Sequence, residues 1–130
     1  MTAASSRRTL RRSAYHAAVD PEHLTAFRDA LLAGRTRLHD ELIETEPEAP
    51  GQMTYGSQAS AASQVFAQQR DLALHERAER HLQQIEAAII RLDDGTFGTC
   101  LSCGRAIAEE RLEALPWAAL CIECQRQADR

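Results

Sequence analysis

The sequence has no lysine, few aromatic residues and no long apolar segment. All fifteen basic residues are arginine and nineteen residues are acidic, which gives a formal net charge of −4. A chain of this charge is a poor general ligand for the phosphate backbone of nucleic acids. Its longest apolar run, residues 115–122, is eight residues long, whereas a membrane-spanning helix needs about 20. We therefore expect no membrane partner and no general binding to nucleic acid.

The scarcity of aromatic residues, 5% of the chain, and the lack of β-branched runs disfavour a β-sheet protein. Alanine is abundant and has the highest helix propensity, so the composition predicts a mainly α-helical fold. The first thirty residues also lack the apolar stretch of a secretory signal. We expect the protein to act in the reducing cytoplasm.

Cysteine occurs only in two Cys-x-x-Cys pairs that are separated by seventeen residues. Each pair can present two thiolates to one metal ion, and four thiolates complete the tetrahedral coordination of a structural zinc. The spacing between and within the pairs is typical of zinc sites. The sequence therefore predicts one structural zinc ion with four ligands, Cys100, Cys103, Cys121 and Cys124.

Two disulfides, or four unrelated buried thiols, are the alternatives to a metal site. Disulfides need an oxidising compartment, and nothing in the sequence indicates export. All five histidines precede the first cysteine pair, so none is an obvious competing ligand. Because four thiolates fill the coordination shell, the ion would have no open position for catalysis. Since the sequence also offers no plausible nucleophile–base pair, we expect that the protein is not an enzyme.

Residues 1–19 are predicted to form a basic, flexible arm. This segment carries four arginines and no acid. Mitochondrial transit peptides share such a composition, being rich in arginine and serine and poor in acids. A disordered or loosely docked arm is the simpler interpretation, and it is the one we favour.

An amphipathic helix is predicted to follow the arm. Asp20 can cap its free amide groups, and Pro21 suits the first helical position. The helix must end by Glu46, because Pro47 disfavours helical geometry in the residue before it. Two prolines and two glycines then predict a loop over residues 47–56.

A second amphipathic helix is expected to begin at Ser57 or Ser60 and to end at Asp94, with Gly95 as its C-terminal cap. The two helices should pack as an antiparallel hairpin over residues 20–94. Apolar residues on both helices recur every three or four positions, the spacing of a coiled-coil face. The positions predicted for the core between the helices include Leu42, Val65, Leu72 and Leu82.

Charge is uneven along the hairpin. Residues 38–69 contain five acids and no arginine: Asp40, Glu41, Glu44, Glu46 and Glu48. A solvated acidic loop would account for this pattern. The alternative is that the far end of the hairpin, with a tip loop at about residues 47–60, is adapted to a positively charged or metal-containing partner.

Residues 95–130 are predicted to form a small zinc module that ends in a C-terminal helix. Gly98 and Gly104 flank the first cysteine pair, where the backbone must turn tightly around sulfur. The module has a small apolar core of Ile107, Leu112, Leu115 and Trp117. Such a core is too small to be stable alone, so metal binding should supply much of the folding energy.

The module carries a pattern that extends beyond its cysteines. Phe97-Gly98-x-Cys100-x-x-Cys103-Gly104-x-x-Ile107 leads to Arg111-Leu112-Glu113-Ala114-x-Pro116, and Leu120-Cys121-x-x-Cys124-Gln125 completes the pattern. This pattern resembles the zinc-finger signature of the DksA/TraR family over about 30 residues. The preceding helical hairpin extends the resemblance over most of the chain.

The resemblance implies a bacterial transcription regulator that binds RNA polymerase directly, without a DNA operator. Members of that family insert the tip of a coiled coil through the secondary channel of the polymerase, toward the catalytic magnesium. Their zinc module remains outside, against the channel rim. The expected architecture is therefore a long antiparallel coiled-coil hairpin followed by a four-cysteine zinc module, with no sequence-specific binding to DNA.

The tip departs from the family pattern, which has Asp-x-x-Asp-x-Ala at the start of the second helix. An ungapped count from Cys100 places Ser57, Ser60 and Ala62 at these positions. Hydroxyl groups thus replace both carboxylates. Glu46 and Glu48, across the loop, are candidates to supply acidity instead.

A second departure concerns guanosine tetraphosphate. Positions that are basic in members responding to this nucleotide are Gln84 and Gln125 here, whereas Arg77 and Arg111 remain as candidate nucleotide or polymerase contacts. We therefore expect no synergy with guanosine tetraphosphate.

Two alternative functions remain compatible with the sequence. One is a stand-alone zinc module for protein–protein or nucleic-acid contact, for which the basic arm is the main support. The other is a thiol redox switch, in which oxidation expels zinc and unfolds residues 95–130. The redox switch could coexist with polymerase binding.

Overall fold

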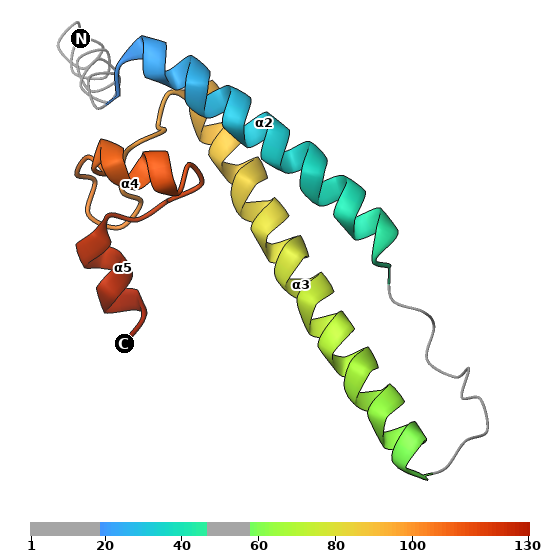
Figure 1. Ribbon diagram of the computed structural model, residues 1–130. Helices are drawn as coiled ribbons and strands as arrows, with labels where there is room; N and C mark the ends of the chain where they lie inside the picture. Colours follow the sequence, from blue (N-terminus) through green and yellow to red (C-terminus); the bar gives the residue numbers. More distant parts are fainter. Residues whose placement is uncertain (1–18, 47–57) are drawn as a thin grey trace, which may run out of the picture. The chain divides into compact units, whose positions relative to one another are not determined.

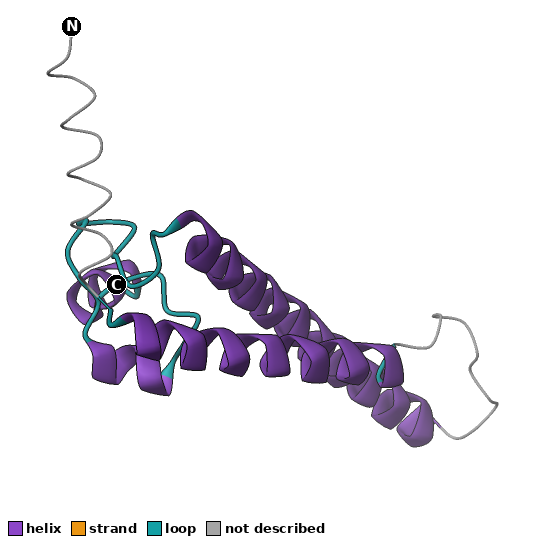
Figure 2. Cartoon of the chain, turned by 90° about the horizontal axis from the view of Figure 1, so that it is seen from above, coloured by secondary structure: helices purple, strands orange, loops and turns teal. Residues whose placement is uncertain are grey.

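A computed structural model describes residues 19–46 and 58–130 of the chain. This part contains four α-helices: α2 (Pro21–Glu44), α3 (Gln58–Asp94), α4 (Glu109–Ala114) and α5 (Ile122–Ala128) (Figure 1). The described residues include no β-strand (Figure 2), and their one isolated β-bridge joins Thr99 to Ala106. The mainly α-helical prediction is confirmed. No helix among these residues is long and apolar enough to cross a membrane.

The chain divides into two compact units. The described residues of the first unit are 19–35 and 84–130, and those of the second are 36–46 and 58–83. Helices α2 and α3 each contribute to both units. The predicted arm, apart from Val19, and most of the predicted tip loop lie outside the described residues.

Helix α2 begins and ends where local signals in the sequence place its boundaries. The N–H of Glu22 donates to Asp20 Oδ1 at 3.3 Å, and the N–H of Leu24 donates to the Asp20 carbonyl at 3.1 Å. The Asp20 side chain therefore satisfies an amide group that has no partner inside the helix, and its carbonyl accepts the first hydrogen bond of the helix. The helix ends at Glu44, within the limit that Pro47 sets.

Helix α3 has 37 residues, a length of about 55 Å at 1.5 Å per residue. It ends at Asp94 and is followed by Gly95, whose φ of 81° lies in the left-handed region. The N–H groups of Thr96 and Phe97 donate back to the Arg91 carbonyl, at 2.9 and 3.1 Å. The predicted glycine cap is confirmed, because this arrangement satisfies the Arg91 carbonyl in the last turn of the helix.

Within the first unit, the start of α2 runs antiparallel to the end of α3 (Figure 1). Phe27 and Leu31 of α2 are buried, as are Ile85, Ala88 and Ile89 of α3. The same unit buries three residues of the predicted zinc module, Phe97, Ile107 and Leu112. Leu115 and Trp117 are only half-buried. The base of the hairpin and the cysteine-bearing module therefore share one apolar core.

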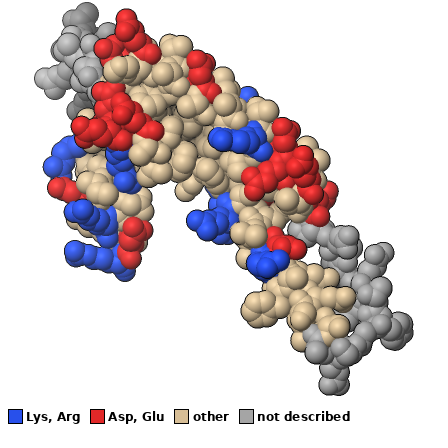
Figure 3. Space-filling view, viewed as in Figure 1, with Lys and Arg blue, Asp and Glu red and all other residues tan. Residues whose placement is uncertain are grey.

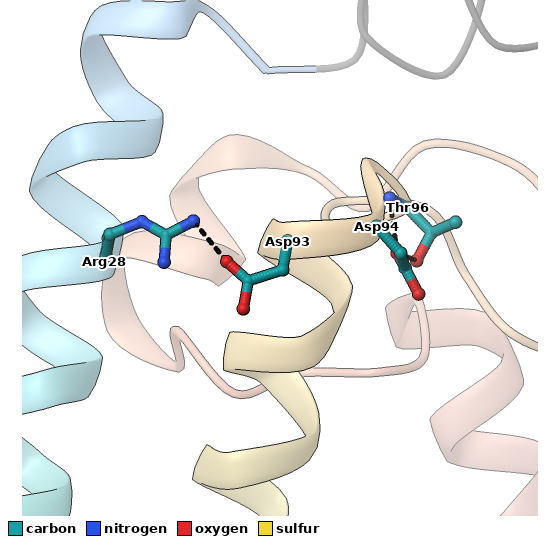
Figure 4. Close-up of polar contacts among 4 residues, drawn as sticks. All are labelled: Arg28, Asp93, Asp94 and Thr96. Carbon is teal, nitrogen blue, oxygen red and sulfur yellow. Dashed lines mark hydrogen bonds and ion pairs between the residues drawn. The ribbon is translucent and has the colours of Figure 1, made fainter.

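Polar contacts reinforce the first unit. Arg28 Nη2 donates to Asp93 Oδ1 at 2.8 Å and links α2 to α3 (Figure 4). Beside it, the Asp94 carboxylate accepts from the backbone N–H and the hydroxyl of Thr96, just past the helix end (Figure 4). His23 Nδ1 contacts Glu109 Oε1 and joins α2 to α4.

The second unit buries less of α3 than predicted. Leu38 and Ala78 are buried, and Leu42 and Leu82 are half-buried. The prediction of core positions at Val65 and Leu72 was wrong, because their exposed fractions are 36% and 47%. Helix α2 has 24 residues and α3 has 37, so α2 cannot cover α3 along its whole length.

Candidate metal centre

The first cysteine pair lies in a tight backbone turn. Gly98 and Gly104, which flank it, have φ angles of 85° and 75°. The Gly104 N–H donates to the Cys100 carbonyl at 3.0 Å, and the Cys100 N–H donates to the Arg105 carbonyl at 2.8 Å. A Cβ atom built on Gly104 would meet nothing within 4 Å, so the positive φ alone selects glycine there.

The second cysteine pair lies at the start of α5. Cys121 immediately precedes this helix and makes no side-chain capping hydrogen bond, and Cys124 is in the first turn. The Leu101 N–H, from the first pair, donates to the Ala119 carbonyl at 2.9 Å. This bond brings the turn of the first pair next to the segment that enters the second.

The four sulfur atoms form one cluster in which all lie within 4.8 Å of one another. Cys103 Sγ and Cys121 Sγ are 3.8 Å apart, and all four cysteines are free thiols. A tetrahedral ion with Zn–S bonds of about 2.3 Å requires sulfur–sulfur distances of about 3.8 Å, whereas a disulfide would require about 2.05 Å. The cluster fits a zinc ion rather than two disulfides. It is the sole such group of potential metal ligands in the described part of the chain.

Hydrogen bonds shift the pKa values of the clustered cysteines in different directions. Burial raises the pKa of Cys100, but backbone N–H groups of Cys103, Cys121 and Ser102 outweigh it and lower the pKa to about 6. The backbone N–H of Arg105 likewise lowers the pKa of Cys103. A hydrogen bond with the Cys121 side chain instead raises the pKa of Cys124 to about 12. Four thiolates this close repel one another, so a cation is needed to hold all of them deprotonated.

Arg105 provides positive charge beside the first pair. Its side chain hydrogen-bonds to Cys103, which raises the pKa of the guanidinium, and it lies 3.7 Å from Glu123 of α5. Both members of that ion pair are largely exposed, so its contribution to stability is small. Arg105 was not predicted as a site residue from the sequence, although a basic residue directly after Cys103-Gly104 is a usable signal.

The four cysteines differ in their exposure to solvent. Cys100 is buried, with 2% of its surface exposed, whereas Cys121 and Cys124 are half-buried and Cys103 is exposed. Cys121 also lines a groove of about 460 Å³ between α4 and α5, together with Arg111, Leu115 and Ile122. Of the four cysteines, only Cys121 lines this groove.

The candidate tip residues are only partly described. Ser60 and Ala62 are exposed residues near the start of α3, and Glu46 is an exposed residue after the end of α2. Ser57 and Glu48 lie outside the described residues. Acidic side chains gather over the C-terminal part of α2, while the described residues at the start of α3 show no charge (Figure 3).

The two candidate arginine contacts lie in different compact units. Arg77 is exposed on α3. Arg111, in α4, is half-buried, and its Nε donates to the Leu120 carbonyl at 3.1 Å. A third arginine, Arg91, was not predicted as a site residue, although its spacing of three residues from Ala88 places it on the buried face of α3.

Comparison with known proteins identifies the family of this fold and cluster. Residues 95–130 match the family model of the prokaryotic dksA/traR C4-type zinc finger. Beyond this module, the chain is 31% identical over 112 residues to the RNA polymerase-binding transcription factor DksA of Haemophilus influenzae, covering 85% of this chain and 77% of the relative. The chain belongs to the DksA/TraR family. The resemblance inferred from the motif is confirmed.

Other DksA proteins agree with this assignment. The RNA polymerase-binding transcription factor DksA of Escherichia coli K12 is 33% identical over 107 residues, covering 82% of this chain and 71% of the relative. The structure of DksA2 from Pseudomonas aeruginosa superposes with a TM-score of 0.69, at 31% identity and 85% coverage of both chains. The Dks protein of Chlamydia trachomatis, at 18% identity and a TM-score of 0.55, supports the fold alone. The two curated relatives are named RNA polymerase-binding transcription factors.

Proposed function

We propose that this chain binds RNA polymerase directly and regulates transcription. The observation that carries the proposal is the similarity to DksA proteins over 82–85% of the chain, which includes the hairpin as well as the zinc finger. A zinc finger shared alone would support only a general metal-binding module. RNA polymerase as the partner implies a cytoplasmic location and requires no sequence-specific contact with DNA.

The proposed metal centre holds one structural zinc ion. Its ligands are the four clustered cysteines, Cys100, Cys103, Cys121 and Cys124. Zinc would join two backbone segments that few apolar residues hold together, and it would leave no coordination position open for chemistry. Residues 95–130 are accordingly the proposed zinc module, residues 20–94 the hairpin and residues 1–19 a flexible arm.

The proposed mode of binding follows the family: the tip of the hairpin enters the secondary channel, and the zinc module stays at its rim. The acid-rich C-terminal part of α2 supports this orientation, because a channel that holds magnesium ions attracts negative charge. The tip residues proposed to face the polymerase are Ser57, Ser60, Ala62, Glu46 and Glu48. Arg77 and Arg111 are proposed as further contacts, and no response to guanosine tetraphosphate is expected.

A binding experiment with core RNA polymerase tests the proposal. Tagged full-length protein should retain core polymerase, and a protein known to occupy the secondary channel should displace it in proportion to its concentration. The same protein without polymerase should not shift promoter DNA in a gel. Retention that the channel ligand does not reduce would contradict the proposed site, and the absence of retention would contradict the proposed partner.

A further inference from the structure

The segment that leads into the second cysteine pair is held through its carbonyl groups. Arg91 Nη2 donates to the Trp117 carbonyl at 3.3 Å, and Arg111 Nε donates to the Leu120 carbonyl at 3.1 Å. Between them, the Ala119 carbonyl accepts the Leu101 N–H from the first pair. Residues 117–120, immediately before Cys121, are therefore fixed at three of their four carbonyls.

Arg91 makes this contact from the end of α3. The residue has an exposed fraction of only 9%, and burial lowers the pKa of its guanidinium while nearby Asp94 raises it. Its own carbonyl accepts the N–H groups of Thr96 and Phe97, which close the helix. Arg91 thus accepts the capping hydrogen bonds of α3 with its backbone carbonyl, and with its side chain it binds the segment that precedes Cys121.

Arg111 makes the second contact from α4. The Cys103–Cys121 interval includes α4 and residues 117–120, so its conformation decides where the second pair lies relative to the first. Each hydrogen bond from a guanidinium to a carbonyl is charge-assisted and so is stronger than a neutral one. The two arginines restrain this interval near its end, at the carbonyls of Trp117 and Leu120.

We infer that Arg91 and Arg111 are positioning residues of the zinc site, which hold residues 117–120 so that all four sulfurs reach one ion. The inference rests on the proposed zinc site. It makes the end of α3 part of the metal centre: zinc binding and the Arg91 contact stabilise each other, and loss of either weakens the other. Substitution of a group that orients a metal ligand without touching the ion typically lowers metal affinity by about 10- to 100-fold. We expect a loss of this size here.

Metal affinity in matched arginine variants tests the inference. Arg91→Met and Arg111→Met remove each donor and keep most of the side-chain volume. Arg80→Met on α3 and Arg126→Met on α5 remove exposed arginines and serve as controls. Zinc affinity of full-length protein is measured by competition with a chromogenic chelator, and Co²⁺ absorption reports the coordination geometry. Each positioning variant should lose affinity by about 10-fold or more, while the controls stay at the native value.

A conservative variant separates positioning from a general loss of stability, and hydrogen exchange tests the link between zinc and the end of α3. Arg91→Lys, which keeps a charged donor, should recover part of the affinity that Arg91→Met loses. In the native protein, zinc removal should speed hydrogen exchange of the Thr96 and Phe97 amides more than that of amides within residues 70–80 of α3. This measurement needs no variant, so it shows whether zinc stabilises the end of α3 even if Arg91→Met does not fold.

The outcomes distinguish this inference from the proposed zinc site. If Cys103→Ser retains native zinc affinity, the four-cysteine site itself is wrong. If Cys103→Ser loses zinc but both methionine variants bind it like the controls, the site stands and the positioning role is wrong. Equal exchange of the Thr96 and Phe97 amides with and without zinc would likewise overturn the link to α3.

Discussion

The rings of Phe27 and Phe97 lie with their centroids 5.4 Å apart and their planes inclined by 44°. Phe27 belongs to α2 and Phe97 follows the end of α3, and both side chains are buried. Tilted pairs at this distance stabilise a core beyond the apolar area that they bury. The pair therefore joins α2 directly to the start of the zinc module.

A double-mutant cycle should measure this coupling. Phe27→Leu and Phe97→Leu keep an apolar side chain and remove one ring each. We expect a coupling energy of about 0.5–1.5 kcal/mol in the free energy of unfolding, determined by urea denaturation with zinc present. Additive effects of the two substitutions would mean that the rings act only through separate contacts.

Removal of one zinc ligand should unfold the module and spare most of the hairpin. We expect native protein to bind one zinc ion per chain and Cys103→Ser to bind much less, because three thiolates leave the ion incompletely coordinated. Trp117, the single tryptophan, should report the loss by fluorescence, while circular dichroism retains most of the helical signal. Leu101 is an exposed residue between Cys100 and Cys103. The Leu101→Ala variant is therefore the control and should bind zinc normally. If the Trp117 fluorescence of the native protein stays unchanged in excess chelator, the metal has no structural role.

Two leucine-to-alanine substitutions should differ in their effect on the free energy of unfolding, because one leucine is buried and the other is exposed. Leu31 has an exposed fraction of 1% and Leu72 of 47%. Leu31→Ala should cost roughly 2–5 kcal/mol, because it removes buried methyl groups and leaves a cavity. Leu72→Ala should cost less than about 1 kcal/mol, since alanine and leucine have similar helix propensities and the site is half open to solvent. Denaturant titrations of both variants provide the comparison, and equal costs would mean that Leu72 is buried in solution.

Substitutions at the tip should separate binding from regulation. Serine can only donate or accept hydrogen bonds, whereas a carboxylate attracts metal ions and repels phosphates. We expect Ser57→Ala with Ser60→Ala to leave polymerase affinity nearly unchanged. Ser57→Asp with Ser60→Asp should strengthen the effect on transcription without tightening binding much. Promoter-complex lifetime and abortive initiation at saturating protein are the measurements. If the aspartate pair behaves like the native protein, occupancy of the channel alone becomes the better explanation.

The parts of the fold that were predictable depend on neighbouring residues in the chain. Asp20 and Pro21 determine the start of α2, Gly95 ends α3, and the cysteine spacing predicts a cluster that the four sulfurs form. Each of these signals acts within a few residues or through a well-known metal geometry.

The parts that were not predictable depend on distant partners. The exposure of Val65 and Leu72 depends on whether another helix covers them, which an apolar spacing cannot reveal. The Arg91 contact joins residues 26 positions apart, and its acceptor is a backbone carbonyl, which every residue carries. A sequence therefore cannot identify the carbonyl that an arginine binds, even where the spacing places that arginine on the buried face.

The open space around Gly104 has a consequence for chirality. Because φ is 75° there and no atom would meet an added Cβ, the cost of a side chain arises from its handedness rather than from its size. L-Alanine at this position should be strained by roughly 1–3 kcal/mol. D-Alanine, whose preferred φ is positive, should fit without strain and should lower the entropy of the unfolded chain. Full-length protein with D-alanine at residue 104 should thus bind zinc at least as tightly as the natural protein.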